Sequence, residues 1–229
     1  MNKNKILPHG VKPKVKICCI NSIEEAKLAI EFGASALGLV SEMPSGPGVI
    51  NEDKIIEIAK SVPPPIATFL LTSKTDANEI INQQRKLRTN TIQIVDELKT
   101  GTYQEIKDAL PGIKIVQVIH VLDDNSIKEA VKISKGVDAI LLDSGNPNLE
   151  VKELGGTGRR HNWEISKKIR EEIEIPIFLA GGLNHANVRE AIETVSPFAL
   201  DVCSGVRTNG NLDPGKLKLF FDKVRNSSC

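Results

Sequence analysis

Residues 175–205 read IPIFLAGGLNHANVREAIETVSPFALDVCSG and contain a short apolar run, a helical pattern and a second apolar run. The runs Ile175–Leu179 and Phe198–Cys203 are almost continuously apolar, as strands of a parallel sheet are when helices cover both faces. Two parallel strands need a long crossover connection, which is usually a helix. The stretch therefore predicts a strand, helix, strand unit of an α/β protein.

The same plan recurs along the rest of the chain, where each of six earlier apolar runs is followed by a helical pattern. These runs are Lys14–Cys19, Ala36–Val40, Pro65–Leu71, Thr91–Val95, Ile113–Val121 and Val137–Leu142. The eight runs start about 26 residues apart, a spacing that suits one strand, one helix and two loops. Helix start signals agree with this plan, since Ser22-Ile-Glu-Glu25 fits a capping box and Asp213-Pro214 fits an N-cap followed by proline.

Eight such units without a break in composition favour one closed (β/α)8 TIM barrel over two smaller domains. We expect residues 1–229 to form this single domain, with 1–13 as a short lead-in. The alternative is an open doubly wound sheet, but its G-x-G-x-x-G fingerprint does not follow the first run. The longest insertion, Ser144–Asn162, follows the sixth run at the face where barrels carry their active sites.

Composition excludes several classes of partner. The chain has 30 Lys and Arg against 29 Asp and Glu, and 3% of its residues are aromatic, so neither nucleic acid nor an anionic membrane is an expected partner. No run approaches the roughly 20 apolar residues of a membrane span, and the first residues lack the apolar segment of a signal peptide. We expect a cytoplasmic protein whose four cysteines are free thiols.

Polar residues at the carboxyl ends of the predicted strands share one rim of the barrel. Alternation along the first strand places Lys16 and Cys18 on the inner face, where the lysine could favour the thiolate, although Cys18 could also be one more small buried residue. Asp143 follows an apolar strand, and burial of a carboxylate is costly unless the group is exposed, paired or functional. Cys18 and Asp143 are therefore the candidate catalytic residues.

Glycine clusters follow three of the predicted strands and predict an anion site. Backbone N–H groups beside helix starts bind anions, and barrels often hold a phosphate in the loops after strands seven and eight. We expect Gly181, Gly182, Ser204 and Gly205 to bind phosphate. The expected substrate contacts are Lys16, Gly156, Thr157, Arg159 and Arg207. A metal site is not expected, because His120 with nearby cysteines lacks the usual spacing of zinc ligands.

Five motifs occur in order between residue 14 and about residue 224, and together they resemble those of phosphoribosylanthranilate isomerase. The motifs are Lys16-Ile17-Cys18, Leu141-Leu142-Asp143-Ser144, Gly155-Gly-Thr-Gly158 with Trp163, Leu179-Ala-Gly-Gly-Leu183 and Asp201-Val-Cys-Ser-Gly-Val206. The resemblance implies a (β/α)8 barrel that isomerises an N-linked ribose phosphate to its 1-deoxyribulose form in tryptophan biosynthesis, without a cofactor. It also implies Cys18 as the general base and Asp143 as the general acid.

The sequence departs from the family at positions that bear on substrate choice. Cys19 stands where the family usually has Gly, Val95 where it has His, and Arg207 where it has an acidic residue. The segment Ser41–Ile50 contains no Arg or Lys, and Pro47 stands about where the family has a substrate-binding arginine. Either Arg207 or Arg159 meets the anthranilate carboxylate, or the substrate lacks that group.

Two classes of function remain open from the sequence. The first is an isomerase acting on phosphoribosylanthranilate or a related ribose phosphate adduct, and the second is a binder of a phosphorylated metabolite that does not turn it over. Retention of both Cys18 and Asp143 favours the enzyme. We expect a small phosphorylated sugar-amine as the substrate and a monomer or homodimer as the assembly.

Overall fold

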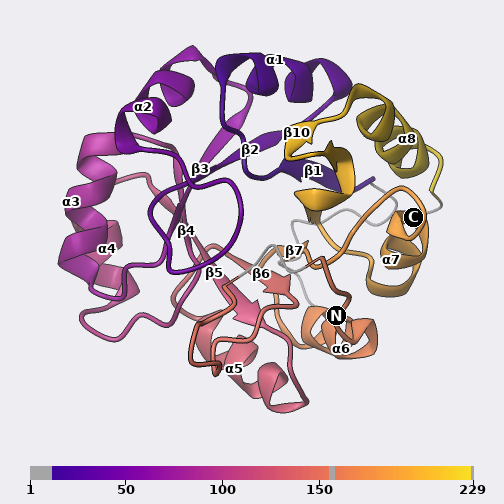
Figure 1. Ribbon diagram of the computed structural model, residues 1–229. Helices are drawn as coiled ribbons and strands as arrows, with labels where there is room; N and C mark the ends of the chain where they lie inside the picture. Colours follow the sequence, from indigo (N-terminus) through magenta and orange to yellow (C-terminus); the bar gives the residue numbers. More distant parts are fainter. Residues whose placement is uncertain (1–11, 155–157, 228–229) are drawn as a thin grey trace.

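The computed structural model describes residues 12–154 and 158–227, and its strands close into a barrel (Figure 1). The strands pair in chain order, each parallel to the next, and the last pairs with the first. They are β1 Lys14–Ile17, β2 Ala36–Val40, β3 Ala67–Thr72, β4 Thr91–Ile94, β5 Lys114–His120, β6 Ala139–Asp143, β7 Ile177–Leu179 and β8 Ala199–Val202. This arrangement confirms the (β/α)8 barrel that the repeating pattern predicts.

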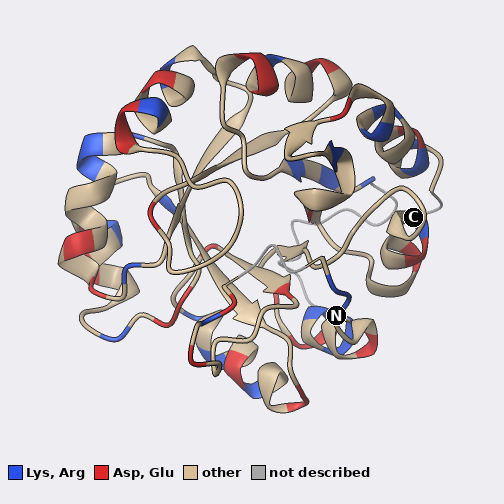
Figure 2. Ribbon diagram, in the orientation of Figure 1, with Lys and Arg blue, Asp and Glu red and all other residues tan. Residues whose placement is uncertain are grey.

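A helix follows each strand and lies outside the barrel (Figure 1). The helices are α1 Ile23–Phe32, α2 Glu52–Ser61, α3 Ala77–Leu87, α4 Tyr103–Ala109, α5 Asn125–Ile133, α6 Trp163–Glu172, α7 Val188–Val195 and α8 Pro214–Arg225. Charged residues of both signs are spread over these outer helices (Figure 2). Within the described ranges, no helix combines the length and apolar character needed to cross a membrane.

Between β8 and α8 the chain forms a short 3-10 turn, Ser204–Val206, and then a small hairpin of β9, Arg207–Thr208, and β10, Asn211–Leu212. The hairpin lies beside α8 and β1 in Figure 1. It places Arg207 next to the carboxyl end of β1, where the guanidinium donates hydrogen bonds to the carbonyl oxygens of Cys18 and Cys19.

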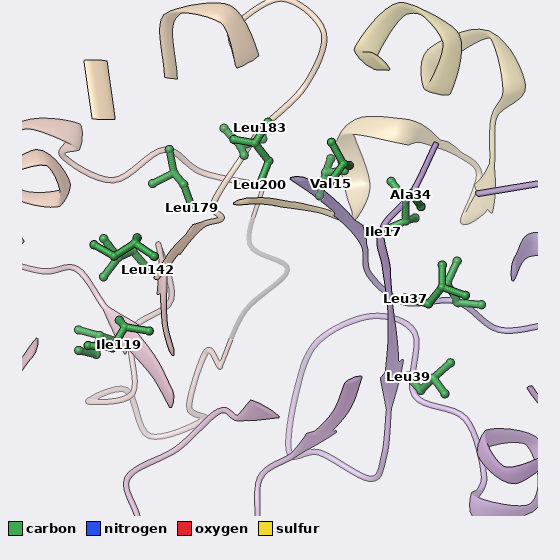
Figure 3. Packing of buried hydrophobic residues seen from close by; sticks show 14 of the residues in the cluster. Val15, Ile17, Ala34, Leu37, Leu39, Ile119, Leu142, Leu179, Leu183 and Leu200 are labelled. Atoms are coloured by element: carbon green, nitrogen blue, oxygen red, sulfur yellow. The ribbon is translucent and has the colours of Figure 1, made fainter. Parts of the chain in front are cut away.

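Two apolar layers fix which way each strand faces. Val15 and Ile17 belong to the layer between strands and helices, together with Leu37, Leu142 and Leu200 (Figure 3). The barrel interior holds a second cluster that includes Cys18, Phe69, Leu141 and Phe178. The alternation predicted for the first strand is therefore confirmed, and Cys18 points inward.

The structure shifts the bounds of every predicted strand except β2 by one or two residues, and the shifts at β1 and β7 have clear physical causes. β1 ends at Ile17 instead of Cys19, because Cys19 has a φ of 62° and leaves the extended conformation. β7 begins at Ile177 instead of Ile175, because Pro176 has no N–H to donate to a neighbouring strand.

The predicted helix starts are largely as expected. Asp213 accepts a hydrogen bond from the Lys216 N–H at 3.0 Å, with proline in the first turn of α8. Ser22 accepts from the Glu25 N–H at 3.1 Å, but the Glu25 carboxylate does not complete the capping box. Its oxygens instead lie 2.7 and 3.0 Å from the guanidinium of Arg207, and such charge-assisted pairs are stronger than a neutral cap bond.

Candidate active site

The carboxyl ends of the strands surround a pocket of about 670 Å³, a volume that includes its part open to solvent. Its lining includes Cys18, Asp143, Gly181, Gly182 and Ser204, so the strand ends bring together the predicted catalytic pair and most of the predicted phosphate loop.

Lys16 lies below Cys18 inside the barrel and is fully buried. Its Nζ is 2.9 Å from Asp201 Oδ2. Burial alone would lower the pKa of Lys16, but the carboxylate of Asp201 and the Cys18 thiol outweigh it and raise that pKa. Lys16 therefore remains a cation beneath the thiol. It does not line the pocket, although the sequence predicts that it contacts the substrate.

Gly38 of β2 leaves the room that these two groups need. A Cβ atom at this position would lie 2.9 Å from Cys18 Sγ and 3.1 Å from Lys16 Nζ. The absent side chain lets the thiol and the ammonium group share one space in the barrel interior.

Cys19 also lines the pocket, which the sequence analysis did not predict. Strict alternation would turn it away from Cys18, but its positive φ ends the strand and redirects its side chain. Its Sγ lies 2.8 Å from Cys203 Sγ and 3.5 Å from the Pro47 carbonyl oxygen. Three thiols therefore stand at one end of the barrel.

Asp143 ends β6 and is buried, with 8% of its surface exposed. Its Oδ1 accepts a hydrogen bond from the Ser144 N–H at 2.7 Å. Burial raises the pKa of Asp143 above the usual carboxyl range despite this bond and the nearby His120. The residue is suited to carry a proton, as a general acid must.

The two glycine loops of the predicted phosphate site pack directly on each other. A Cβ atom on Gly205 would lie 1.9 Å from the Leu183 carbonyl oxygen, so only glycine allows the loop after β8 to approach the loop after β7 so closely. Gly181 and Gly182 have φ values of 82° and 63°, in the left-handed region that favours glycine. Gly205 thus shapes the loop without lining the pocket.

Arg207 lies outside the pocket, contrary to the expectation that it reaches the substrate. It is 9% exposed and donates to Glu25, to the Gly210 carbonyl at 2.8 Å, and to the carbonyls of Cys18 and Cys19 at 3.2 and 2.6 Å. The buried Glu25 carboxylate and these carbonyls already use the donors on both Nη atoms, so these atoms are directed away from the pocket.

Other predicted substrate contacts lie in the long loop after β6. Arg159 forms an ion pair with Glu153, and its side chain is 59% exposed. Gly156 and Thr157 lie outside the described residues. Ser45, after β2, donates its hydroxyl to the Lys152 carbonyl, so the loops after β2 and β6 meet over the pocket.

Two buried polar residues in the pocket lining were not predicted as site residues. Gln93 Oε1 and Asp201 Oδ1 are buried without a hydrogen-bond partner among the described residues. The signal that selected Asp143, a polar residue on an apolar strand, also applies to both of them. No group of three or more His, Cys, Asp or Glu residues in the described ranges is arranged to hold a metal ion.

Comparison with known proteins gives the family. The profile of N-(5'phosphoribosyl)anthranilate (PRA) isomerase matches residues 15–223. The chain belongs to this family. The N-(5'-phosphoribosyl)anthranilate isomerase of Methanothrix thermoacetophila is 34% identical over 216 residues, covering 93% of this chain and 98% of the relative. That of Methanosarcina acetivorans is 32% identical over 228 residues, covering 94% of each.

Solved structures of the PRA isomerase family share the fold over nearly the whole chain. The Thermotoga maritima phosphoribosyl anthranilate isomerase aligns with a TM-score of 0.78 and 27% identity, covering 93% of this chain and 98% of that one. A family structure in complex with reduced 1-(O-carboxyphenylamino)-1-deoxyribulose 5-phosphate aligns with a TM-score of 0.75, 25% identity and the same coverage. Membership in the PRA isomerase family confirms the resemblance seen in the sequence.

Proposed function

We propose that this protein is an isomerase that performs an Amadori rearrangement on an N-linked ribose 5-phosphate, with N-(5'-phosphoribosyl)anthranilate as the first candidate substrate. The observation that best supports this function is that Cys18 and Asp143 line one pocket in a chain of the PRA isomerase family. A protein that only bound its ligand would have no need of a thiol and a buried carboxyl group at the same place.

The reaction needs a proton donor and a proton acceptor at different atoms of the sugar. Asp143, whose pKa is raised by burial, delivers a proton to the ribose ring oxygen, and the ring opens to an imine. Cys18 then removes the proton from C2, and the resulting enol-amine tautomerises to the 1-amino-1-deoxyribulose. Lys16 lies beside Cys18 in the barrel interior, since a Cβ atom on Gly38 would contact both side chains.

The phosphate is bound, in this proposal, by backbone N–H groups of the loops after β7 and β8. Gly181, Gly182 and Ser204 line the pocket together. Within the described ranges, no Arg or Lys side chain lines this pocket. Anion binding by backbone N–H groups at a helix start needs no cationic side chain. Anchoring the phosphate there holds the ribose between acid and base, which lowers the entropic cost of the reaction.

The lack of a cation in the lining favours a second candidate substrate. Arg207 is held by Glu25, and Arg159 is paired with Glu153, so neither is placed to meet an anthranilate carboxylate. A carboxylate buried without a cation costs several kcal/mol. A ribose phosphate adduct whose aromatic or amine part lacks a carboxylate would avoid this cost.

The test compares two substrates that differ in one group. Turnover of N-(5'-phosphoribosyl)anthranilate and of N-(5'-phosphoribosyl)aniline is followed by absorbance, and growth of a tryptophan auxotroph gives an independent readout. Isomerisation of either compound supports the proposal, and the ratio of kcat/KM values decides between the candidates. Binding of both without turnover of either would establish a binding protein instead.

Variants assign the roles of the two catalytic candidates. Cys18→Ala and Asp143→Asn should each lower kcat about 100-fold or more. Asp108→Asn, an identical substitution on the exposed face of α4, is the matched control and should turn over at the parent rate. A Cys18→Ala variant that folds and isomerises at the parent rate would remove the thiol from the mechanism.

A further inference from the structure

Cys19 and Cys203 face each other at the mouth of the barrel, where neither has a role in the proposed chemistry. They follow β1 and β8, two strands that pair with Ile17 opposite Val202. Their sulfur atoms lie 2.8 Å apart, compared with roughly 2.05 Å in a disulfide bond. The two thiols are free in this structure.

The backbone holds Cys19 in a conformation that directs its thiol at Cys203. A φ of 62° is unfavourable for a residue with a Cβ atom and costs of order 1 kcal/mol, so the surroundings must impose it. Arg207 Nη2 donates to the carbonyl oxygens of Cys18 and Cys19 and fixes both peptide groups. The thiol pair is therefore built into the fold.

The two thiols differ in character, as a nucleophile and its partner must. The hydrogen bond between Cys203 and Cys19 lowers the pKa of Cys203, and the positive charge of Arg207 lowers it further. Hydrogen bonds to Cys18 and Cys203 raise the pKa of Cys19 well above its usual value. Cys203 is also partly exposed at the pocket, so a small oxidant can reach it.

We propose that Cys19 and Cys203 form a site of reversible oxidation, at which a hydroperoxide converts the two thiols to a disulfide across the barrel mouth. The Cys203 thiolate attacks the peroxide oxygen, the O–O bond breaks, and Cys203 becomes a sulfenic acid while water or an alcohol leaves. Cys19 then attacks the Cys203 sulfur, the S–O bond breaks, and a second molecule of water leaves. One hydroperoxide is reduced as two thiols are oxidised.

The disulfide changes the pocket that the proposed isomerase uses. Cys19 follows Cys18 in the chain, and Cys203 precedes Ser204 of the phosphate loop. A bond between Cys19 and Cys203 therefore shifts both the proposed base and the proposed phosphate site. Shifts of about 1 Å at such groups can cost 100-fold in rate. This consequence rests on the proposed function, whereas formation of the disulfide does not.

Peptide mapping of the full-length chain tests the disulfide directly. The reduced protein is treated with hydrogen peroxide at equal concentration, its remaining thiols are alkylated, and it is digested with trypsin. We expect a linked pair of the peptides 17–27 and 190–207, separated by dithiothreitol. Its mass should equal the sum of the two reduced peptides, less two mass units for the disulfide and plus one alkyl group on Cys18. Cys203 recovered as a sulfinic acid with Cys19 alkylated, and no linked pair, would overturn the proposal.

Variants identify which cysteine of peptide 17–27 is bonded. The linked pair should persist in Cys18→Ser and be lost in Cys19→Ser and Cys203→Ser, while Cys229→Ser, which removes a thiol outside the described residues, should behave as the parent. A bond that survives Cys19→Ser but is lost in Cys18→Ser would show that Cys203 pairs with Cys18, and this would refute the proposal. The parent chain alone gives the main result, so the test does not depend on any variant folding.

Activity is then compared between the oxidised and reduced parent protein. We expect oxidation to lower kcat/KM about tenfold or more, with recovery in dithiothreitol and no comparable loss in Cys203→Ser. A linked peptide pair in a chain that is inactive even when reduced would leave the oxidation site standing and count against the proposed isomerase. An unchanged kcat/KM in a fully linked, active enzyme would refute the effect on the pocket.

Discussion

Replacement of Arg207 by alanine is expected to destabilise the fold and to do little to substrate affinity. The side chain donates to both oxygens of Glu25, with Nη1 to Oε1 at 2.7 Å and Nη2 to Oε2 at 3.0 Å. Both partners are buried, and removing one side of a buried ion pair costs about 3–5 kcal/mol, because the other charge is left without compensation. We expect Arg207→Ala to lower the free energy of unfolding by that amount.

A double-mutant cycle separates the ion pair from the other bonds of Arg207. Glu25→Ala alone should also cost about 3–5 kcal/mol, and the double variant should cost less than the sum, by a coupling of roughly 1–3 kcal/mol. The double variant remains less stable than the parent, since the carbonyls of Cys18 and Cys19 and the Leu212 N–H lose their partners. Urea unfolding measures all four proteins.

Enzyme kinetics give the outcome that would refute this reasoning. If Arg207→Ala unfolds within about 1 kcal/mol of the parent but raises KM for a carboxylate-bearing substrate, the guanidinium binds substrate and the placement argued here is wrong. Arg207→Lys sharpens the comparison, because it keeps a positive charge but cannot contact both Glu25 oxygens and the carbonyls at once.

Three further substitutions test the electrostatics and the loops. Burial raises the pKa of Asp143, so ionisation of this residue destabilises the parent as pH rises above about 4. Asp143→Asn should remove this loss of stability, and parallel curves of Tm against pH for the two proteins would contradict the prediction. Burial, reinforced by Arg160, lowers the pKa of His161 to about 4. The free energy of unfolding of the parent should therefore fall by up to about 3 kcal/mol as pH falls from 6.5 to 4, and urea unfolding of His161→Gln should show a smaller fall. Gly205→Ala meets the backbone of the loop after β7 and should cost more than about 2 kcal/mol. Gly215→Ala, in α8, meets only the Asp213 carboxylate at 3.2 Å and should cost less than about 1 kcal/mol in the same measurement.

The barrel could be predicted because strand and helix patterns are local. Each apolar run and each capping signal is a property of a few neighbouring residues, and their spacing along the chain is enough to predict eight units. The inward direction of Cys18 follows from alternation in the same way. Asp143 could be selected because a carboxyl group on an apolar strand is unfavourable without a function.

The partners of Arg207 could not be predicted, because they depend on contacts between distant parts of the chain. Glu25 fits a capping box within its own helix, and nothing local indicates that a hairpin from the far end of the sequence brings a guanidinium to it. The direction of the Cys19 side chain could not be predicted from the sequence for the same reason. Alternation fails at that residue because Arg207 holds its peptide group in a conformation that a strand pattern does not contain.

The departures at Cys19 and in the loop after β2 belong to one arrangement. A Cβ atom on Gly48 would lie 2.4 Å from Cys19 Cβ, so a side chain at residue 19 and a side chain at residue 48 exclude each other while the loop keeps this path. The Cys19 thiol also contacts the Pro47 carbonyl, which ties the loop to the end of β1. Where the family usually has glycine at the first position and an arginine in the loop, this chain has a thiol and a loop without a cation. The thiol that faces Cys203 and the glycine at position 48 are therefore linked by packing, within a segment, Ser41–Ile50, that contains no Arg or Lys.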